Sequence, residues 1–365
     1  MNTITLGQAF ENISQRVVVS YLDHLADFQG IIPAGAPEGL EEAQRDTHAF
    51  FHAFYTRLFN DPASFGLPLD EDAYVISDRH GTNEKAEITK KVKKARDLME
   101  SGMGFLMQAG AKGRLRGGDL LLDEAVVNDY AGKSKAKRQF LKGLEAVGLA
   151  IVPEGEGVVL RSERFPAMML AFKMLAEACA PQGRTGELNF GRCDFRALNQ
   201  GYEPEAMDLY RVFNPADFKR VSQLHAYLTE LNYKPVYQYY GMSGWEVKYQ
   251  GSRAKKGTPL LEIEYSERYL NQLRIFIKCA ASNRIVPLLA DRPLFLQEDF
   301  NRRANHCNGD KCNWCANKKS LGPTEWNFKG ETRTICWYTN PDIHVVDDAT
   351  VDLVKEYVML HEALG

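Results

Sequence analysis

The stretch KSKAKRQFLKGLEAVGLAIVPEGEGVVL, residues 133–160, combines a basic amphipathic helix with a β-hairpin. Apolar residues at helical spacing predict a helix that ends at Gly148, a residue type that favours the left-handed conformation found after helices. Two short β-branched runs then flank Pro153–Gly157, and this pattern predicts a tight connection between two antiparallel strands. Residues 133–160 therefore predict a helix followed directly by a hairpin.

Two further helices are predicted upstream of this stretch. A basic helix is expected from about Asn83 to Leu106, and a short helix from Leu120 to Tyr130. These two helices are followed by the basic helix and the hairpin of residues 133–160. Residues 84–161 therefore resemble a winged helix-turn-helix domain, in which three helices precede a hairpin. The resemblance implies that the second basic helix enters the major groove of double-stranded DNA, with the hairpin as the wing. The side chains expected to contact phosphates and bases are Lys133, Lys135, Lys137, Arg138 and Lys142.

Two glutamates at the tip of the predicted hairpin depart from this pattern. Glu154 and Glu156 would lie near DNA phosphates and repel them. Winged helices also serve as protein-contact modules. The alternative is therefore a structural or interaction module without DNA binding, whose basic helices are solvated surfaces or dock against an acidic patch.

The charge of the chain is unevenly distributed, although its net charge is only -3. Residues 1–80 hold four Arg, no Lys and twelve acids, a balance of -8, whereas residues 81–142 hold fourteen bases and eight acids, a balance of +6. We therefore predict an acidic helical region over 1–80 and a winged-helix-like domain over 81–180. Two Gly and one Pro in Pro181–Gly186 predict a linker to a third region, 187–365.

Alternating polar and apolar residues indicate an α+β fold for 187–365. Three segments around Trp245–Tyr249, Leu261–Tyr265 and Leu273–Ile277 alternate with period two, which predicts a half-exposed antiparallel sheet. A helix over 215–231, capped by Asn214, and another over 286–303 are expected to pack on that sheet. Its aromatic residues either form the core and cross-strand pairs or line a pocket for a flat ligand. The pocket residues would be Tyr237, Tyr239, Tyr240, Trp245 and Tyr249.

Four cysteines near the carboxyl end carry the strongest chemical signal. Cys307, Cys312, Cys315 and Cys336 have the spacing Cys-x4-Cys-x2-Cys-x20-Cys, and a predicted hairpin brings the last of them back beside the others. Four thiolates on zinc make a closed tetrahedral site, so this pattern predicts structural zinc in a zinc-ribbon-like hairpin. The same spacing also fits a [2Fe–2S] cluster, and redox-active thiols without metal are a further alternative.

From about Pro215 to its end, the chain resembles uncharacterised bacterial protein families of unknown function. The resemblance is carried by GWEVKY, LRIFIK, the cluster CNGDKCNWC and an acidic terminal helix. It implies a bacterial origin and a metal-stiffened α+β module, and it points to no particular activity. No arrangement of acid, base and nucleophile argues for an enzyme. No apolar run is long enough to cross a membrane and no signal peptide is visible, so we expect a cytoplasmic protein. The leading hypothesis is a DNA-binding regulator with a structural zinc site.

Overall fold

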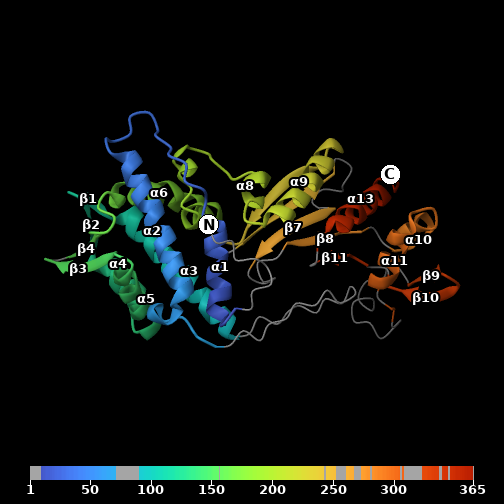
Figure 1. The fold of residues 1–365 in the computed structure, drawn as a ribbon, viewed down its shortest axis with the longest axis horizontal. Coiled ribbons are helices and arrows are strands. Elements are labelled where there is room, and N and C mark those ends of the chain that lie inside the picture. The colour runs from blue at the N-terminus through green and yellow to red at the C-terminus, as the bar shows by residue number, and fades with distance from the viewer. Residues whose placement is uncertain are drawn as a thin grey trace.

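The computed structural model describes residues 10–70, 90–155, 157–241, 244–251, 260–266, 273–279, 282–304, 306–307, 323–336, 339–343 and 346–364. Two lobes lie side by side, with the N-terminal lobe on the left and the C-terminal lobe on the right in Figure 1. Both lobes mix helices with antiparallel strands, which confirms the α+β class.

The N-terminal lobe is mostly helical. Its elements are α1 (Ile13–His24), α2 (Leu40–Asn60), η1 (Pro62–Phe65), α3 (Lys90–Lys112), β1 (Arg114–Arg116), β2 (Asp119–Asp123), α4 (Glu124–Ala131), α5 (Lys135–Ala146), β3 (Ala150–Glu154), β4 (Gly157–Arg161), α6 (Met168–Cys179), η2 (Ala180–Gln182), α7 (Gly183–Gly191) and η3 (Phe195–Leu198). One hydrophobic core runs from α1 to η3, so the acidic region and the winged-helix-like region share a single interior. Phenylalanines of α2 at positions 50, 51 and 54 lie fully buried at its centre.

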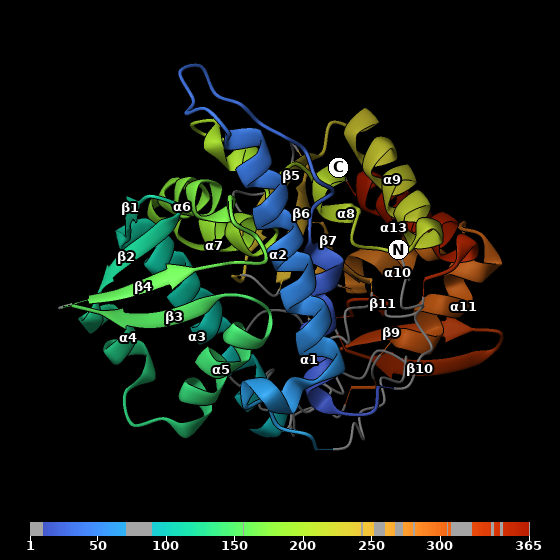
Figure 2. The ribbon, with the colours of Figure 1, turned by 60° about the vertical axis from the view of Figure 1, so that its left-hand side comes forward.

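A four-stranded sheet forms the outer end of this lobe (Figure 2). Its strand order is β1-β2-β4-β3, so β2 pairs with β4 rather than with the following strand β3. All three pairings are antiparallel. The hairpin predicted over 150–160 is thereby confirmed, with Ala150 opposite Arg161.

The C-terminal lobe is built on a five-stranded sheet of order β11-β8-β7-β6-β5. Its elements are α8 (Ala206–Tyr210), α9 (Pro215–Glu230), β5 (Lys234–Tyr239), β6 (Gly244–Gln250), β7 (Leu261–Ser266), β8 (Arg274–Ile277), α10 (Ser282–Leu289), α11 (Leu294–Arg303), β9 (Thr324–Phe328), β10 (Glu331–Ile335), β11 (Asp342–Ile343) and α13 (Asp348–Glu362). The predicted antiparallel sheet is confirmed. Asn214 caps α9 as expected, since its side chain accepts hydrogen bonds from the N–H groups of Ala216 and Asp217.

The polar face of this sheet is less exposed than the alternation predicts. Glu246, Glu262 and Glu264 are each less than 10% exposed. They stay buried because cations on neighbouring positions pair with them: Arg274 bonds to Glu264 at 2.5 Å, and Lys278 bonds to Glu262.

Three other expectations differ from the structure. The first four residues of the helix predicted over 120–130 lie in strand β2 instead, because Leu120 and Leu122 alternate into the core beside β4. The expected linker Pro181–Gly186 is helical instead. Gly186 lets α7 approach the end of α6 so closely that a β-carbon there would lie 1.8 Å from the Cys179 carbonyl oxygen. The helix expected over 286–303 is two helices, α10 and α11.

The two lobes are joined by α1 and by the segment after α7. The hydroxyl of Tyr265, on β7, donates a 2.8 Å hydrogen bond to the Asp23 carboxylate at the end of α1. His24 packs edge-on against the same tyrosine ring, with centroids 4.5 Å apart. In the described part of the chain, no helix is both long enough and apolar enough to traverse a lipid bilayer.

Candidate functional site

Helix α5 is held in place by its apolar side. The Ser134 hydroxyl caps its start, accepting a 3.3 Å hydrogen bond from the Lys137 N–H. Phe140 and Leu144 point into the N-terminal core and are fully buried. Gly143 lies under the ring of Phe65, and a β-carbon at this position would be 2.3 Å from the ring. This packing fixes which side of α5 faces solvent.

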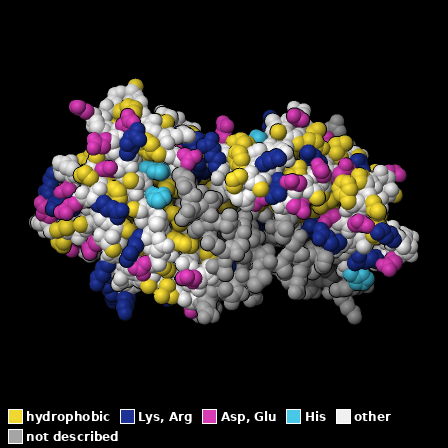
Figure 3. Space-filling view, in the orientation of Figure 1, with side chains coloured by type: hydrophobic (Ala, Val, Ile, Leu, Met, Phe, Trp, Pro, Cys, Tyr) yellow, Lys and Arg dark blue, Asp and Glu magenta, His cyan; other side chains and the backbone are white. Residues whose placement is uncertain are grey.

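The solvent side of α5 carries a basic stripe, defined here as Lys133, Lys135, Arg138 and Lys142. All four side chains are exposed. Figure 3 shows Lys and Arg side chains gathered at the lower left, over the position of α5 in Figure 1. Across the described ranges no acidic side chain forms an ion pair with the stripe, so its charge is available to a partner.

Two of the five predicted DNA-contacting residues also make contacts within the lobe. Arg138 donates hydrogen bonds to the carbonyl oxygens of Gly132 at 2.9 Å and Lys133 at 3.3 Å, and so closes the turn between α4 and α5. The Lys137 ammonium lies 5.1 Å from the centroid of the Tyr130 ring. Replacing either residue would therefore perturb the turn or the α4 contact as well as the surface charge.

The acidic tip of the β3–β4 hairpin is partly neutralised. Glu154 accepts a 2.5 Å bond from Arg116 on β1, and Arg161 on β4 lies 3.7 Å from its other oxygen. Glu156 lies outside the described residues. The repulsion expected between this tip and DNA phosphates is therefore reduced on Glu154 by the guanidinium groups of Arg116, on β1, and of Arg161, on the neighbouring strand β4.

Two of the four predicted metal ligands lie near each other. Cys307 donates its N–H to the Thr334 carbonyl oxygen at 3.0 Å, and His306 forms a bridge with Ile335 at the end of β10. In this register Cys336 is the diagonal neighbour of Cys307. Cys312 and Cys315 lie outside the described residues, and the residues that are described contain no cluster of three or more His, Cys, Asp or Glu suited to a metal ion.

The hairpin predicted between these cysteines is confirmed. Strand β9 pairs with β10, and Phe328 lies opposite Glu331 across a two-residue turn. Both turn residues, Lys329 and Gly330, have positive φ, as hairpin turns of this length require.

The predicted aromatic cluster is divided between the two faces of the sheet. Tyr237 lies opposite Val247, and Tyr239 lies opposite Trp245, so these side chains and the buried Tyr249 share one face. The hydroxyl of Tyr239 donates to the Pro204 carbonyl oxygen at 3.2 Å. Tyr240 is 39% exposed and bonds to Glu246 on the other face. The five residues do not line one common space.

Three cysteines outside the cluster are inert as nucleophiles. Cys179 and Cys193 lie in the N-terminal core, where burial raises the pKa of both thiols well above the usual range. Burial also raises the pKa of Cys279 to about 12. Because the thiolate is the reactive form, these residues behave as small apolar side chains.

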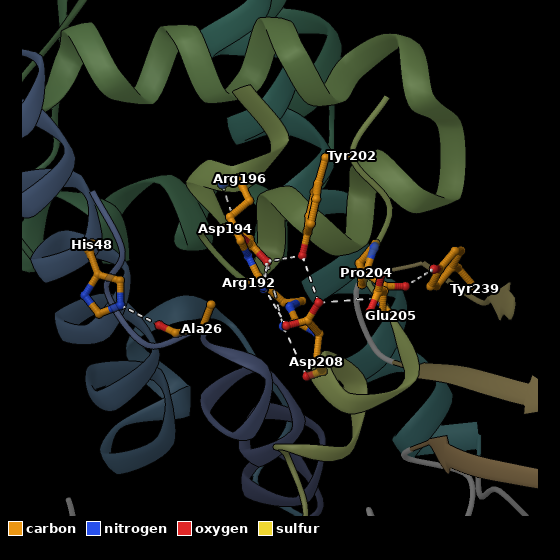
Figure 4. A network of polar contacts seen from close by, with 10 residues as sticks. All are labelled: Ala26, His48, Arg192, Asp194, Arg196, Tyr202, Pro204, Glu205, Asp208 and Tyr239. Atoms are coloured by element: carbon orange, nitrogen blue, oxygen red, sulfur yellow. Dashed lines mark hydrogen bonds and ion pairs between the residues drawn. The ribbon is translucent and has the colours of Figure 1, made fainter. Parts of the chain in front are cut away.

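A buried polar network at the lobe junction escaped the sequence analysis (Figure 4). Arg196 binds the Asp194 carboxylate through two nitrogens, at 2.9 and 2.7 Å, and binds Asp208 at 2.5 Å. The Tyr202 hydroxyl lies 3.2 Å from Asp194. Arg192, only 3% exposed, reaches the same aspartate at 3.8 Å. One feature of the sequence could have indicated this network: the charged residues Arg192, Asp194 and Arg196 alternate with uncharged residues over 190–197.

Comparison of the chain with protein-family models, with curated protein sequences and with solved structures finds no match.

Proposed function

We propose that the protein is a DNA-binding regulator in which residues 90–161 form a winged helix-turn-helix. The single observation that supports this most is the combination of element order and sheet order. Helix α3, strand β2, helices α4 and α5, and the hairpin β3–β4 follow one another, and β4 lies between β2 and β3. In this arrangement α5 is the helix that enters the major groove, and the hairpin is its wing.

The surface charge supports the same proposal. The basic stripe lies on the side of α5 opposite the core, where a groove-binding helix presents its side chains. Lys133, Lys135 and Lys142 would neutralise phosphates, and each contact to duplex DNA releases about one counterion. Arg114, exposed on β1, adds a cation at the same end of the lobe. Affinity for DNA should therefore fall steeply as salt rises.

The proposal is tested with a fluorescently labelled duplex of mixed sequence, titrated with the full-length protein over a salt series. Micromolar binding at low salt with a steep slope of log K against log salt is expected. Replacing Lys133, Lys135 and Lys142 together by Ala should reduce that slope by about 3, since each removed contact contributes about 0.9. Arg138 stays in place because it also closes the turn before α5.

The matched control replaces Lys219, Lys234 and Lys329 by Ala. These exposed lysines lie on the C-terminal lobe, and their loss changes the net charge by the same amount. The control should keep the wild-type slope. No binding of the wild-type protein at low salt would refute the proposal and leave the basic helices as solvated or protein-contact surfaces.

We further propose that Cys307, Cys312, Cys315 and Cys336 hold a structural zinc ion. Diagonal neighbours in an antiparallel pair lie about 7 Å apart on one side, close enough for Cys307 and Cys336 to converge on one cation. The two-residue turn of β9–β10 brings the fourth cysteine back to the first. Zinc bound to four thiolates has no open position, so its expected role is to hold the β9–β10 hairpin against α11.

Elemental analysis of the purified protein tests the metal assignment. One zinc per chain is expected, with a colourless protein. Visible absorption and iron after anaerobic purification would instead assign a [2Fe–2S] cluster.

A further inference from the structure

A small cavity lies between the lobes, beside the network of Figure 4. Its volume is about 60 Å³, enough for about four or five water molecules or one molecule of similar size. The end of α1 and the segment after it supply Asp23, His24 and Asp27, and Arg192 follows α7. Asp208 and Arg211 come from the C-terminal lobe, so the cavity is bounded by both lobes.

Arg192 borders this cavity and has buried hydrogen-bond donors without a partner. Its residue is 3% exposed, and its Nε and Nη1 atoms have no hydrogen-bond partner. Only Nη2 is engaged, at 3.4 Å from the Asp208 carbonyl oxygen. Asp194, which Arg196 binds through both carboxylate oxygens, approaches only Nη2 of Arg192, at 3.8 Å, and leaves Nε and Nη1 without a partner. A buried guanidinium with open donors favours an acceptor that carries negative charge.

His24, which also borders the cavity, has an unpartnered hydrogen-bond acceptor where Arg192 has unpartnered donors. Its Nδ1 lies 2.6 Å from the Ser20 carbonyl oxygen, so Nδ1 must carry the proton and donate it. Complete burial lowers the pKa of His24 to about 3, against the effect of the Ser20 hydrogen bond, and Arg192 lowers it further. The ring is therefore neutral, and its buried Nε2 is an acceptor without a partner. A molecule in the cavity must bring a donor to satisfy this atom.

We propose that the cavity binds a small oxyanion that also carries a hydrogen-bond donor. An α-hydroxycarboxylate of about five heavy atoms meets both requirements: its carboxylate accepts from Arg192 and its hydroxyl donates to His24 Nε2. Dihydrogen phosphate has the same two features. Asp208 does not oppose the anion strongly, since Arg196 binds it at 2.5 Å. This ligand site is independent of the basic stripe and of the cysteines.

Saturation-transfer NMR with the full-length protein tests the proposal with three probes: glycolate, acetate and orthophosphate. The measurement is made at pH 5, because Asp23 is then mostly protonated while glycolate stays ionised; about two thirds of acetate is ionised at this pH, and its Kd is corrected for that fraction. Glycolate should bind with a Kd of about 1 mM, a value in range for so small a ligand. Acetate lacks the donor and should bind at least about fivefold more weakly.

Two variants assign the binding atoms. Arg192→Met should abolish binding of all three probes, whereas His24→Phe should weaken glycolate to the level of acetate and leave acetate unchanged. Phe at position 24 keeps an aromatic ring against Tyr265, so this variant carries the test if Arg192→Met does not fold. Arg57→Met, on the exposed end of α2, is the matched control and should bind as the wild type does.

The probes also distinguish two ligand sources. A Kd for orthophosphate below that for glycolate would assign the natural ligand to phosphate, and the reverse order would assign it to a hydroxycarboxylate. Absence of saturable binding by every probe up to about 50 mM would show a cavity that holds water only and overturn the proposal. Equal binding of glycolate and acetate, unchanged in His24→Phe, would overturn it as well.

Discussion

Replacing Asp23 by Asn tests the contact between α1 and β7 that connects the two lobes. The Asp23 carboxylate lies at the end of α1, largely buried, and accepts a 2.8 Å hydrogen bond from the Tyr265 hydroxyl. Burial raises its pKa from the ordinary 3.8 to about 6, against the smaller lowering effect of that hydrogen bond. The amide of Asn keeps an oxygen that accepts from Tyr265 and removes the charge.

The sign and size of the effect follow from linkage. Between pH 4 and pH 6 the folded protein holds a proton on Asp23 that the unfolded chain has released, so the free energy of unfolding falls as pH rises through this window. The difference between 3.8 and about 6, at 1.36 kcal/mol for each pH unit, corresponds to about 3 kcal/mol. Asp23→Asn should therefore stabilise the protein by up to about 3 kcal/mol at neutral pH.

Urea unfolding of wild type and variant at several pH values measures the effect. Tryptophan fluorescence is a suitable probe, because buried Trp245 stacks on Tyr265 with centroids 6.0 Å apart. The advantage of Asp23→Asn should grow by about 2 kcal/mol between pH 4.5 and pH 7.5. Asp27→Asn, at an exposed site four residues further on, should change stability by less than about 0.5 kcal/mol. A pH-independent difference between Asp23→Asn and wild type would refute the reasoning.

Three further predictions concern the α5 region and the metal. Gly143→Ala should destabilise the N-terminal lobe by about 1 to 3 kcal/mol, because the new methyl group meets the Phe65 ring, while Gly104→Ala, with open space around it, should be neutral or stabilising in the same urea assay. Glu154→Gln should tighten duplex binding and steepen its salt dependence, because Arg116 becomes available to phosphates while Arg161 keeps its ion pair with Asp119; weaker binding would contradict this. Cys307→Ser should lose zinc and lower the unfolding temperature, and unchanged metal content would remove Cys307 from the ligand set.

Regular periodicity made much of the fold predictable. The hairpin over 150–160, the helix capped by Asn214 and the strands of the C-terminal sheet were all indicated by local patterns, and each forms where expected. Such patterns are informative because one buried face imposes period two on a strand and period 3.6 on a helix.

The failures occurred where tertiary contacts override local preference. Leu120 to Leu122 suit a helix by composition, but β4 offers them a strand partner. Pro181–Gly186 has the composition of a linker, yet the glycine serves close packing between α6 and α7. The junction network was equally hidden, since Asp208 meets Arg196 only after the chain has turned through the segment between η3 and α8. The basic stripe, in contrast, follows directly from helical spacing on α5.

The position of α7 and η3 in the N-terminal core has a consequence for how the chain is made. Phe190 packs against Phe51 with ring centroids 5.4 Å apart. The aromatic side chains of α2 are therefore not completely buried until residues 190–198 have been synthesised. At about 5 to 20 residues per second, on the order of 10 to 40 s separate the synthesis of α1 from that of η3. During this interval we expect the aromatic side of α2 to be incompletely covered on the nascent chain. A fragment cut at residue 180 would carry the same incompletely covered surface permanently and should aggregate on expression.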